Sequence, residues 1–433
     1  MQWAVADQRP SQVKAIVPGV SESALMLNFL QPDAFNLEAP IIWGVQVATQ
    51  ERRLAGVRQL LEERKVHRAC RPCHWNGPMS PPSGAAQTSS RTSCATTAEG
   101  PFSTADHCRR VSGITVLAAL VGGWYDVFLP GRLRDFKVLQ DNGVDAPLTV
   151  GPWTHMSVDA YACITREALD FGLPYAHGRQ PADRASVRLF VTGSEQWRDF
   201  PTWPPPGYRP PRHHLQLDGA PAVAPPPAGA APDGYRYDPA DPTAAVGGPR
   251  MWFPTRSGPV DNSKLEARAD VLAYTTEALD QAVEVIGVVN AEIWFRSSLP
   301  YADVFVRLCD VDPKGRRSRN VCDGLVGLTG ADELILVKVQ LLPTAHRFEP
   351  GHRIRVQVSS GAFPRYNRNT GTGESHATAT TLRVANQQVF HDPKRPSAIT
   401  LPVRATATDW PRSCGGGVRC RRRRRAGCRR GGR

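Results

Sequence analysis

The amino-acid sequence lacks any apolar run long enough to cross a bilayer. Its first residues, MQWAVADQRPSQ, also lack the basic start and the apolar stretch that are typical of a signal peptide. The most apolar stretch covers residues 114–121, a length that suits a buried strand. We therefore expect a cytoplasmic protein that has no membrane partner.

Cysteine is not spread through the chain as it is in a small disulfide-stabilised secreted domain. Of ten cysteines, only Cys163, Cys309 and Cys322 lie in sequence that looks foldable. The net charge of +13 is just as uneven, because residues 412–433 contain ten arginines and no acid, which leaves +3 for the rest of the chain. This tail could bind acidic surfaces non-specifically, but we expect no specific nucleic-acid partner.

The N-terminal quarter of the chain combines helical patterns with one short strand. Residues 1–25 read as a helix followed by the strand-like VKAIVPGV, and residues 41–65 have the Arg/Glu-rich faces of a helix. From residue 66 to residue 110 the periodicity fails, because Ser, Thr, Pro, Cys and Arg dominate. We expect residues 66–104 to be aberrant or disordered, and our hypothesis for this segment and for the tail is a reading-frame error.

Residues 111–193 alternate between strands and helices. ITVLAALVGGWYD has the continuous apolar character of a strand buried on both faces, and PGRLRDFKVLQDNG places Pro130 at a helix start and Gly143 just past its end. A second strand in APLTVGPWTH, a helix over about 157–171 and a third strand in VRLFVTG follow. This spacing predicts an α/β fold class with a parallel sheet and helical crossovers.

The second half of the chain predicts an all-β domain. Eleven prolines lie between residues 201 and 232, so we interpret this segment as an extended linker in which His213 and His214 are solvated. Beyond it, apolar residues alternate over 283–293, 335–341 and 354–358, and the first of these ranges reads as one long strand. Such strands without intervening helices predict a β-sandwich or jelly roll that ends near residue 403.

Two polar residues directly follow the predicted parallel strands. Asp126 ends GGWYD and His155 ends GPWTH. Functional groups gather at the carboxyl ends of parallel strands, and an acid followed by a histidine matches the end of the Ser…Asp…His order of α/β-hydrolases. The acid would hold the imidazole in the tautomer that leaves its other nitrogen free as a base. An Asp that caps a helix and a His exposed in a loop would give the same pattern, so spacing alone leaves both interpretations open.

The motifs around these residues resemble those of the CocE/NonD-type hydrolases, the cocaine esterase and X-Pro dipeptidyl-peptidase group. GGWYDVFLPGRLRDF resembles the acid motif of the family, LTVGPWTH its histidine motif, and VRLFVTGSEQWRDFPTWPP the segment that closes its hydrolase domain. YDPADP, DVLAYTTEAL, CDG and FEPGHRIRVQVSSGAFPRYNRNTGTG resemble its C-terminal jelly roll. Gly361 and Asn367 depart from this pattern, because the family has Ser and Asp there.

The resemblance implies a serine hydrolase that cleaves ester, amide or acyl-proline peptide bonds through an acyl-enzyme. Asp126 would be the triad acid and His155 the general base, while Phe128 would line the acyl pocket or simply belong to the core. No cofactor or metal is implied; the substrate would be a small ester or peptide, and a homo-oligomer stays open. The alternatives are a non-catalytic jelly-roll binding module on a hydrolase remnant, and an unfolded product.

The same resemblance implies a domain organisation. Residues 1–24 and 111–230 would form part of an α/β-hydrolase domain, 25–110 a helical cap insertion, 231–408 a C-terminal jelly roll and 409–433 a disordered Arg-rich tail. The bounds follow the order of the matching motifs, which run from about residue 2 to residue 403 with one interruption at 66–104.

The nucleophile motif of the family, Gly-x-Ser-Tyr-x-Gly, does not occur in the sequence. MQWAVA resembles the helix that follows this motif, so we expect the serine to lie just upstream of Met1, and we expect the chain to be inactive. The look-alike GVSES around Ser21 lacks the second glycine and follows the strand, so we do not assign Ser21 as the nucleophile.

One cysteine-rich segment could suggest a metal or haem. CRPCH at residues 70–74 fits a c-type haem attachment pattern, and with Cys94 and His107 it could suggest zinc. Haem attachment requires export, and the zinc spacing is irregular, so we assign neither group.

Overall fold

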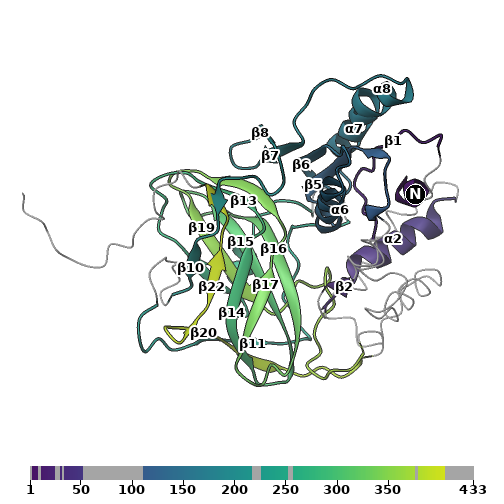
Figure 1. Cartoon of the computed structure of the whole chain (residues 1–433). Coiled ribbons are helices and arrows are strands. Elements are labelled where there is room, and N and C mark those ends of the chain that lie inside the picture. The colour runs from purple at the N-terminus through teal and green to yellow at the C-terminus, as the bar shows by residue number, and fades with distance from the viewer. Residues whose placement is uncertain are drawn as a thin grey trace, which may run out of the picture.

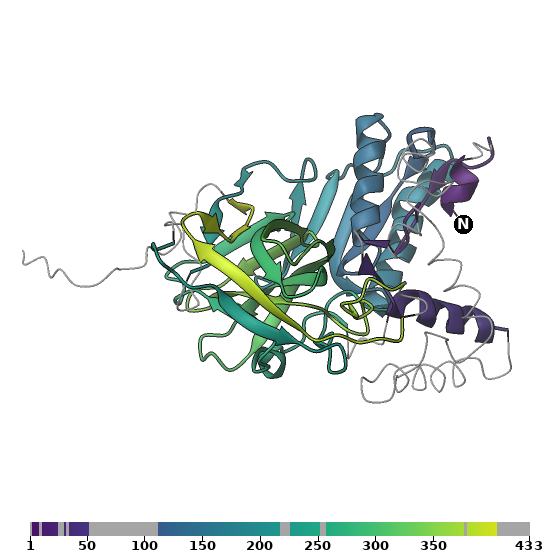
Figure 2. The same cartoon turned by 90° about the horizontal axis from the view of Figure 1, so that it is seen from below.

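The computed structural model describes residues 2–7, 11–24, 30–31, 34–51, 111–216, 226–251, 257–375 and 379–404. These residues form a mixed α/β region and an all-β region that lie side by side (Figures 1 and 2). The predicted combination of an α/β and an all-β part is therefore confirmed. The candidate metal segment and the predicted aberrant stretch and tail lie outside the described residues.

The α/β region is built around a largely parallel sheet. Strands β5 (Leu120–Tyr125), β6 (Leu148–Thr154) and β7 (Val187–Val191) are parallel neighbours, and β8 (Gln196–Phe200) pairs antiparallel with β7. Next to β5, β1 (Ala15–Ile16) pairs in parallel with β4 (Leu117–Ala118), and Gly19 forms a parallel bridge to Val121. Every residue of β5 is buried, as expected for a strand covered on both faces.

Helices connect these strands in the predicted order. Helix α6 (Leu129–Asp141) joins β5 to β6, and its buried residues Leu133, Phe136 and Leu139 belong to the same core as the sheet. Helix α7 (Val158–Glu167), a π-helical turn (Ala168–Gly172) and α8 (Leu173–Ala176) join β6 to β7. Because α6 and α7 each pack apolar residues against the sheet, parallel neighbours can form without a hairpin.

The N-terminal segments differ in part from the prediction. Helix α1 (Gln2–Asp7) and the short strand β1 follow each other in the predicted order. Strands β2 (Leu30–Gln31) and β3 (Ala34–Phe35) form a small hairpin before α2 (Glu38–Thr49). Of the helix predicted over 41–65, the structure describes the part that lies in α2.

The all-β region contains three sheets around one apolar core. The largest has the order β10-β22-β14-β20-β11, with β17 on β14 and β21 on β20; the others are β12-β19-β15-β16 and β18-β13-β23-β9. The strand bounds are β9 (Tyr208–Arg209), β10 (Arg212–His214), β11 (Asp233–Tyr237), β12 (Leu272–Thr275), β13 (Val283–Gly287), β14 (Asn290–Ser297), β15 (Tyr301–Val311), β16 (Ser318–Thr329), β17 (Ile335–Gln340), β18 (Thr344–Phe348), β19 (Arg353–Ser359), β20 (Ala385–Asp392), β21 (Arg395–Pro396), β22 (Ala398–Thr400) and β23 (Val403–Arg404). One short helix, α9 (Ser263–Glu266), precedes β12.

Two expectations for this region are wrong. His213 is not solvated: it is 1% exposed in β10, which pairs with β22, and its neighbour His214 is half-buried. The apparent long strand over 283–293 is two strands in different sheets, β13 and β14, which are separated at Gly287 with a φ of +139°. The apolar alternation continues across this bend because both strands face the same core, so the pattern alone could not reveal the break.

The two regions are joined by backbone hydrogen bonds at the end of β7. The Thr192 amide donates to the carbonyl oxygen of Ala345 at 3.0 Å, and the Arg347 amide donates to that of Thr192 at 2.8 Å. Strand β18 of the all-β region thereby pairs in parallel with Thr192, the residue that follows β7. Among the described helices, none is both long and apolar enough to cross a membrane.

Candidate active site

Asp126 and His155 meet at one edge of the parallel sheet. Asp126 directly follows β5 and His155 directly follows β6. Atom Oδ1 of Asp126 lies 3.1 Å from Nδ1 of His155, with side-chain exposures of 1% and 13%. The structure thus brings together the two residues that the sequence predicted to share the carboxyl end of neighbouring strands.

The turn after β5 fixes the orientation of the Asp126 carboxylate. The backbone amide of Phe128 donates a hydrogen bond to Oδ1 of Asp126 at 3.1 Å, and the amide of Leu129 donates to the carbonyl oxygen of Asp126 at 3.2 Å. Atom Oδ2 of Asp126 is buried and has no hydrogen-bond partner among the described residues. Because a carboxylate only accepts hydrogen bonds, the proton of the contact with His155 belongs to Nδ1, which leaves Nε2 without one in the neutral ring.

A ring contact and a closed turn position His155. The ring of Phe128 packs against it edge-on, with centroids 5.1 Å apart and an interplanar angle of 75°. Between β6 and α7, Ser157 Oγ accepts a hydrogen bond from the Thr154 amide at 2.9 Å, which closes the turn that contains His155. Phe128 therefore contacts the predicted base, whereas a role in lining an acyl pocket stays a prediction.

A buried group of charged residues lies behind the acid. Arg132 on α6 is 1% exposed; burial lowers its pKa to about 10, against the opposing effects of Asp135, Asp126 and Glu22. Burial likewise raises the pKa of Glu22 well above its usual value. Arg132 therefore stays a cation at neutral pH and places a buried positive charge on α6.

Ser21 contacts this buried group. The guanidinium of Arg132 donates hydrogen bonds to the carbonyl oxygen of Ser21 and, at 3.4 Å, to its hydroxyl. Within the described residues, the hydrogen bond of His155 is the one to Asp126, and no serine hydroxyl shares it. The structure thus gives no support to Ser21 as a nucleophile.

Residues far along the chain also reach this edge of the sheet. Gly258 lies so close that a Cβ added to it would be 3.3 Å from Cγ2 of Thr154 and 3.9 Å from the ring of Tyr125. Met251 packs in a cluster with Ala39 and Ile42 of α2, next to Val127. The sequence did not indicate these contacts: glycines at 247, 248 and 258 signal turns, but nothing local says what the turns contact.

The described residues contain no group of three or more His, Cys, Asp or Glu side chains suited to a metal ion. The arrangement of Asp126 and His155 has the chemistry of an oriented general base. The carboxylate fixes the imidazole and stabilises it once protonated, and the free Nε2 can take a proton from a nucleophile.

Comparison with known protein families gives two matches that together cover most of the chain. Residues 1–157 match the X-Pro dipeptidyl-peptidase (S15 family) model, and residues 181–400 match the model of the X-Pro dipeptidyl-peptidase C-terminal non-catalytic domain. Asp126 and His155 both lie in the first match. Cocaine esterase from Rhodococcus sp. (strain MB1 Bresler) is 34% identical over 335 residues, which are 68% of this chain and 57% of that protein.

Solved structures support the same fold. An aminopeptidase from a marine sediment archaeon, Thaumarchaeota archaeon, has a TM-score of 0.70 at 21% identity over 90% of this chain and 72% of that chain. A CocE/NonD family hydrolase from Staphylococcus aureus has a TM-score of 0.61 at 14% identity over 93% of this chain and 70% of that chain. At these identities the likeness shows the fold alone. The chain spans about half the length of the curated relatives that it matches.

Proposed function

Because the chain belongs to the X-Pro dipeptidyl-peptidase family of CocE/NonD-type hydrolases, we propose that Asp126 and His155 are the acid and the general base of a serine hydrolase triad. The observation that carries this proposal is the hydrogen bond of 3.1 Å between Asp126 Oδ1 and His155 Nδ1 at the carboxyl ends of β5 and β6. Family membership supports hydrolase activity in general; the roles of these two residues are our assignment.

In the proposed reaction, Nε2 of His155 takes the proton of a serine hydroxyl while the serine oxygen attacks the carbonyl carbon of the substrate. The imidazolium, stabilised by Asp126, then returns the proton to the leaving alcohol or amine, which leaves an acyl-enzyme that water hydrolyses. The proposed substrates are small esters, amides or acyl-proline peptides, in keeping with relatives named for esters and for X-Pro peptides. Phe128, in contact with His155, would border the acyl group.

We further propose that the 433-residue chain does not turn over substrate by itself. The family motif Gly-x-Ser-Tyr-x-Gly is not in the sequence, and the hydroxyl of Ser21 lies against Arg132. Triad members act as a unit, so an oriented base without its serine contributes little to turnover. What the chain retains is an imidazole that is held in one tautomer and can itself be acylated.

This proposal can be tested with 4-nitrophenyl acetate and a fluorophosphonate probe, followed by mass spectrometry of the intact chain and its peptides. We expect acetylation of His155 in the wild type, slower acetylation in Asp126→Asn because the carboxylate no longer orients the ring, and no serine labelled by the fluorophosphonate. Equal acetylation rates in the two proteins would contradict the role of Asp126. A fluorophosphonate adduct on Ser21 would contradict our account of the nucleophile.

A further inference from the structure

Two glycine-containing segments of the all-β region run beside each other at the candidate active site. We call residues 246–251 and 257–262 the paired segments. The Gly248 amide donates to the Gly258 carbonyl at 2.8 Å, and the Gly258 amide donates to the Gly248 carbonyl at 2.9 Å. Gly258, with a φ of +77°, lies against Tyr125 and Thr154, the residues that directly precede Asp126 and His155. The position of the paired segments therefore constrains the backbone that carries the acid and the base.

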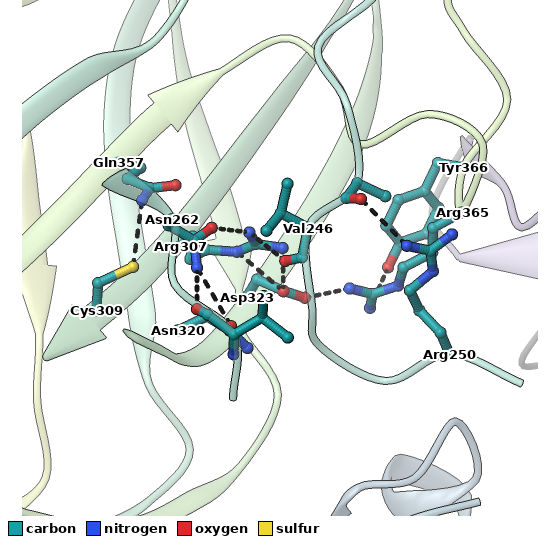
Figure 3. Close-up of polar contacts among 12 residues, drawn as sticks. Val246, Arg250, Asn262, Arg307, Cys309, Asn320, Asp323, Gln357, Arg365 and Tyr366 are labelled. Carbon is teal, nitrogen blue, oxygen red and sulfur yellow. Dashed lines mark hydrogen bonds and ion pairs between the residues drawn. The ribbon is translucent and has the colours of Figure 1, made fainter. Parts of the chain in front are cut away.

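A buried ionic cluster holds the paired segments (Figure 3). Asp323 on β16 and Arg307 on β15 are 0% and 1% exposed and are joined at 3.0 Å; Arg365 binds the other carboxylate oxygen at 2.5 Å. Atom Nη1 of Arg307 donates to the carbonyl oxygen of Val246 at 2.7 Å and to Oδ1 of Asn262 at 2.6 Å. Arg307 thus links the Asp323 carboxylate to both paired segments at once.

Two buried asparagines complete the support. Asn320 donates from Nδ2 to the carbonyl oxygen of Gly258 at 3.0 Å and accepts at Oδ1 from the amide of Val260 at 2.8 Å. Asn262 donates from Nδ2 to the carbonyl oxygen of Val260 at 2.7 Å. The fit is tight, since a Cβ on Gly248 would lie 2.9 Å from Oδ2 of Asp323. Small displacements of this cluster must therefore move the paired segments.

The cluster also reaches α2. The Leu37 amide, at the start of α2, donates to the carbonyl oxygen of Arg365 at 2.9 Å. On the other side, Glu38 of α2 forms a buried ion pair with Arg250 of the paired segments. Contacts from β15, β16 and α2 therefore converge on one short stretch of backbone beside the site.

Buried ion pairs are expensive, and apolar residues of similar size often stabilise a fold as well or better. The favoured explanation for this cluster is therefore the geometry it enforces rather than net stability. We propose that Asp323, together with Arg307 and Arg365, is a positioning cluster that sets the Asp126–His155 geometry through the contact of Gly258 with Tyr125 and Thr154. The catalytic meaning of this cluster rests on the proposed function, whereas its structural effect can be measured without turnover.

The test is NMR of the full chain labelled with ¹⁵N-histidine, in which the signal of His155 is identified by its loss in His155→Gln. We expect the wild type to show a downfield Nδ1 proton from the hydrogen bond with Asp126, and we expect Asp323→Asn to lose this signal or move it upfield. Glu284→Gln is the matched control, because Glu284 is also a largely buried carboxylate paired with an arginine, Arg198 at 2.7 Å, but lies outside the cluster. The control should leave the signal unchanged.

Asn320→Ala is a second variant for the case in which Asp323→Asn does not fold, because it removes the hydrogen bond to Gly258 without leaving an unpaired charge. It should move the His155 signal in the same direction. A folded Asp323→Asn or Asn320→Ala protein with the wild-type signal would overturn the positioning role. Asp126→Asn separates the two proposals. If Asp126→Asn leaves the signal unchanged, as the cluster variants do, the proposed acid–base pair fails. If Asp126→Asn abolishes the signal and the cluster variants do not change it, only the positioning cluster fails.

Discussion

Asp303 is a buried carboxyl group whose ionisation should make the stability of the fold depend on pH. It lies on β15, is 5% exposed, and accepts one hydrogen bond, from Nδ2 of Asn369 at 2.8 Å. Burial raises the pKa of Asp303 to about 7, although the bond from Asn369 opposes this effect. The perturbation to test is Asp303→Asn, which keeps the shape and an acceptor oxygen for Asn369 but cannot ionise.

The direction in which stability changes with pH follows from proton linkage. The pKa of Asp303 is higher in the folded than in the unfolded chain, so the folded chain holds this proton more tightly, and the resulting stability is lost as pH rises through about 7. Each pH unit between the two pKa values changes the free energy of unfolding by about 1.4 kcal/mol. Between about pH 5 and pH 7, the wild type should lose roughly 2–3 kcal/mol from this group, and Asp303→Asn should lose none of it.

The assay is urea unfolding of both proteins, followed by circular dichroism at about pH 5, 6, 7 and 8, with the exposed Asp332→Asn as control. Taking the difference between variant and wild type at each pH cancels titrations that the proteins share. We expect Asp303→Asn to gain stability relative to the wild type as pH rises, while Asp332→Asn runs parallel to it. A difference between Asp303→Asn and wild type that is independent of pH would refute the reasoning.

Two further predictions concern other buried ionisable side chains. Burial, with a smaller effect of His214, lowers the pKa of His213 to about 4. The stability tied to its neutral ring is therefore present above about pH 6.5 and is lost as pH falls toward 4. His213→Leu should flatten the resulting fall in melting temperature, and an equally steep fall in this variant would refute the prediction. Removing one partner of the buried Glu38–Arg250 pair, as in Glu38→Gln, should cost about 3–5 kcal/mol, whereas Glu38→Leu with Arg250→Met should cost much less. Urea unfolding of the single and double variants measures these changes in the free energy of unfolding. A loss in the double variant equal to the sum of the losses in the single variants would contradict the prediction.

The sequence allowed much of the fold and the central pair of the site to be predicted. Period-two and continuous apolar patterns indicated β5, β6 and β7, and Pro130 marked the start of α6. The meeting of Asp126 and His155 followed from a topological rule, because residues just past neighbouring parallel strands share one edge of the sheet. In each case the signal is local, and the partner is set by chain order.

What could not be predicted depends on contacts between distant residues. The burial of His213 results from the pairing of β10 with β22, whose sequence lies nearly 200 residues later, and its own segment is rich in proline. Nothing near Asp323 indicates that Arg307 and Arg365 converge on it, because charged residues in strands are usually solvated. The approach of Gly258 to Thr154 is likewise a tertiary contact without a local signal.

The proposed role of Asp126 depends most directly on which nitrogen of His155 carries the proton in the neutral ring. Long-range ¹H–¹⁵N correlation spectra of the histidine-labelled chain, recorded with the ring neutral, distinguish the two tautomers. We predict a protonated Nδ1, facing Asp126 at 3.1 Å, and an unprotonated Nε2. A protonated Nε2, or equal averaging of the two forms, would show that Asp126 does not hold His155 as a base.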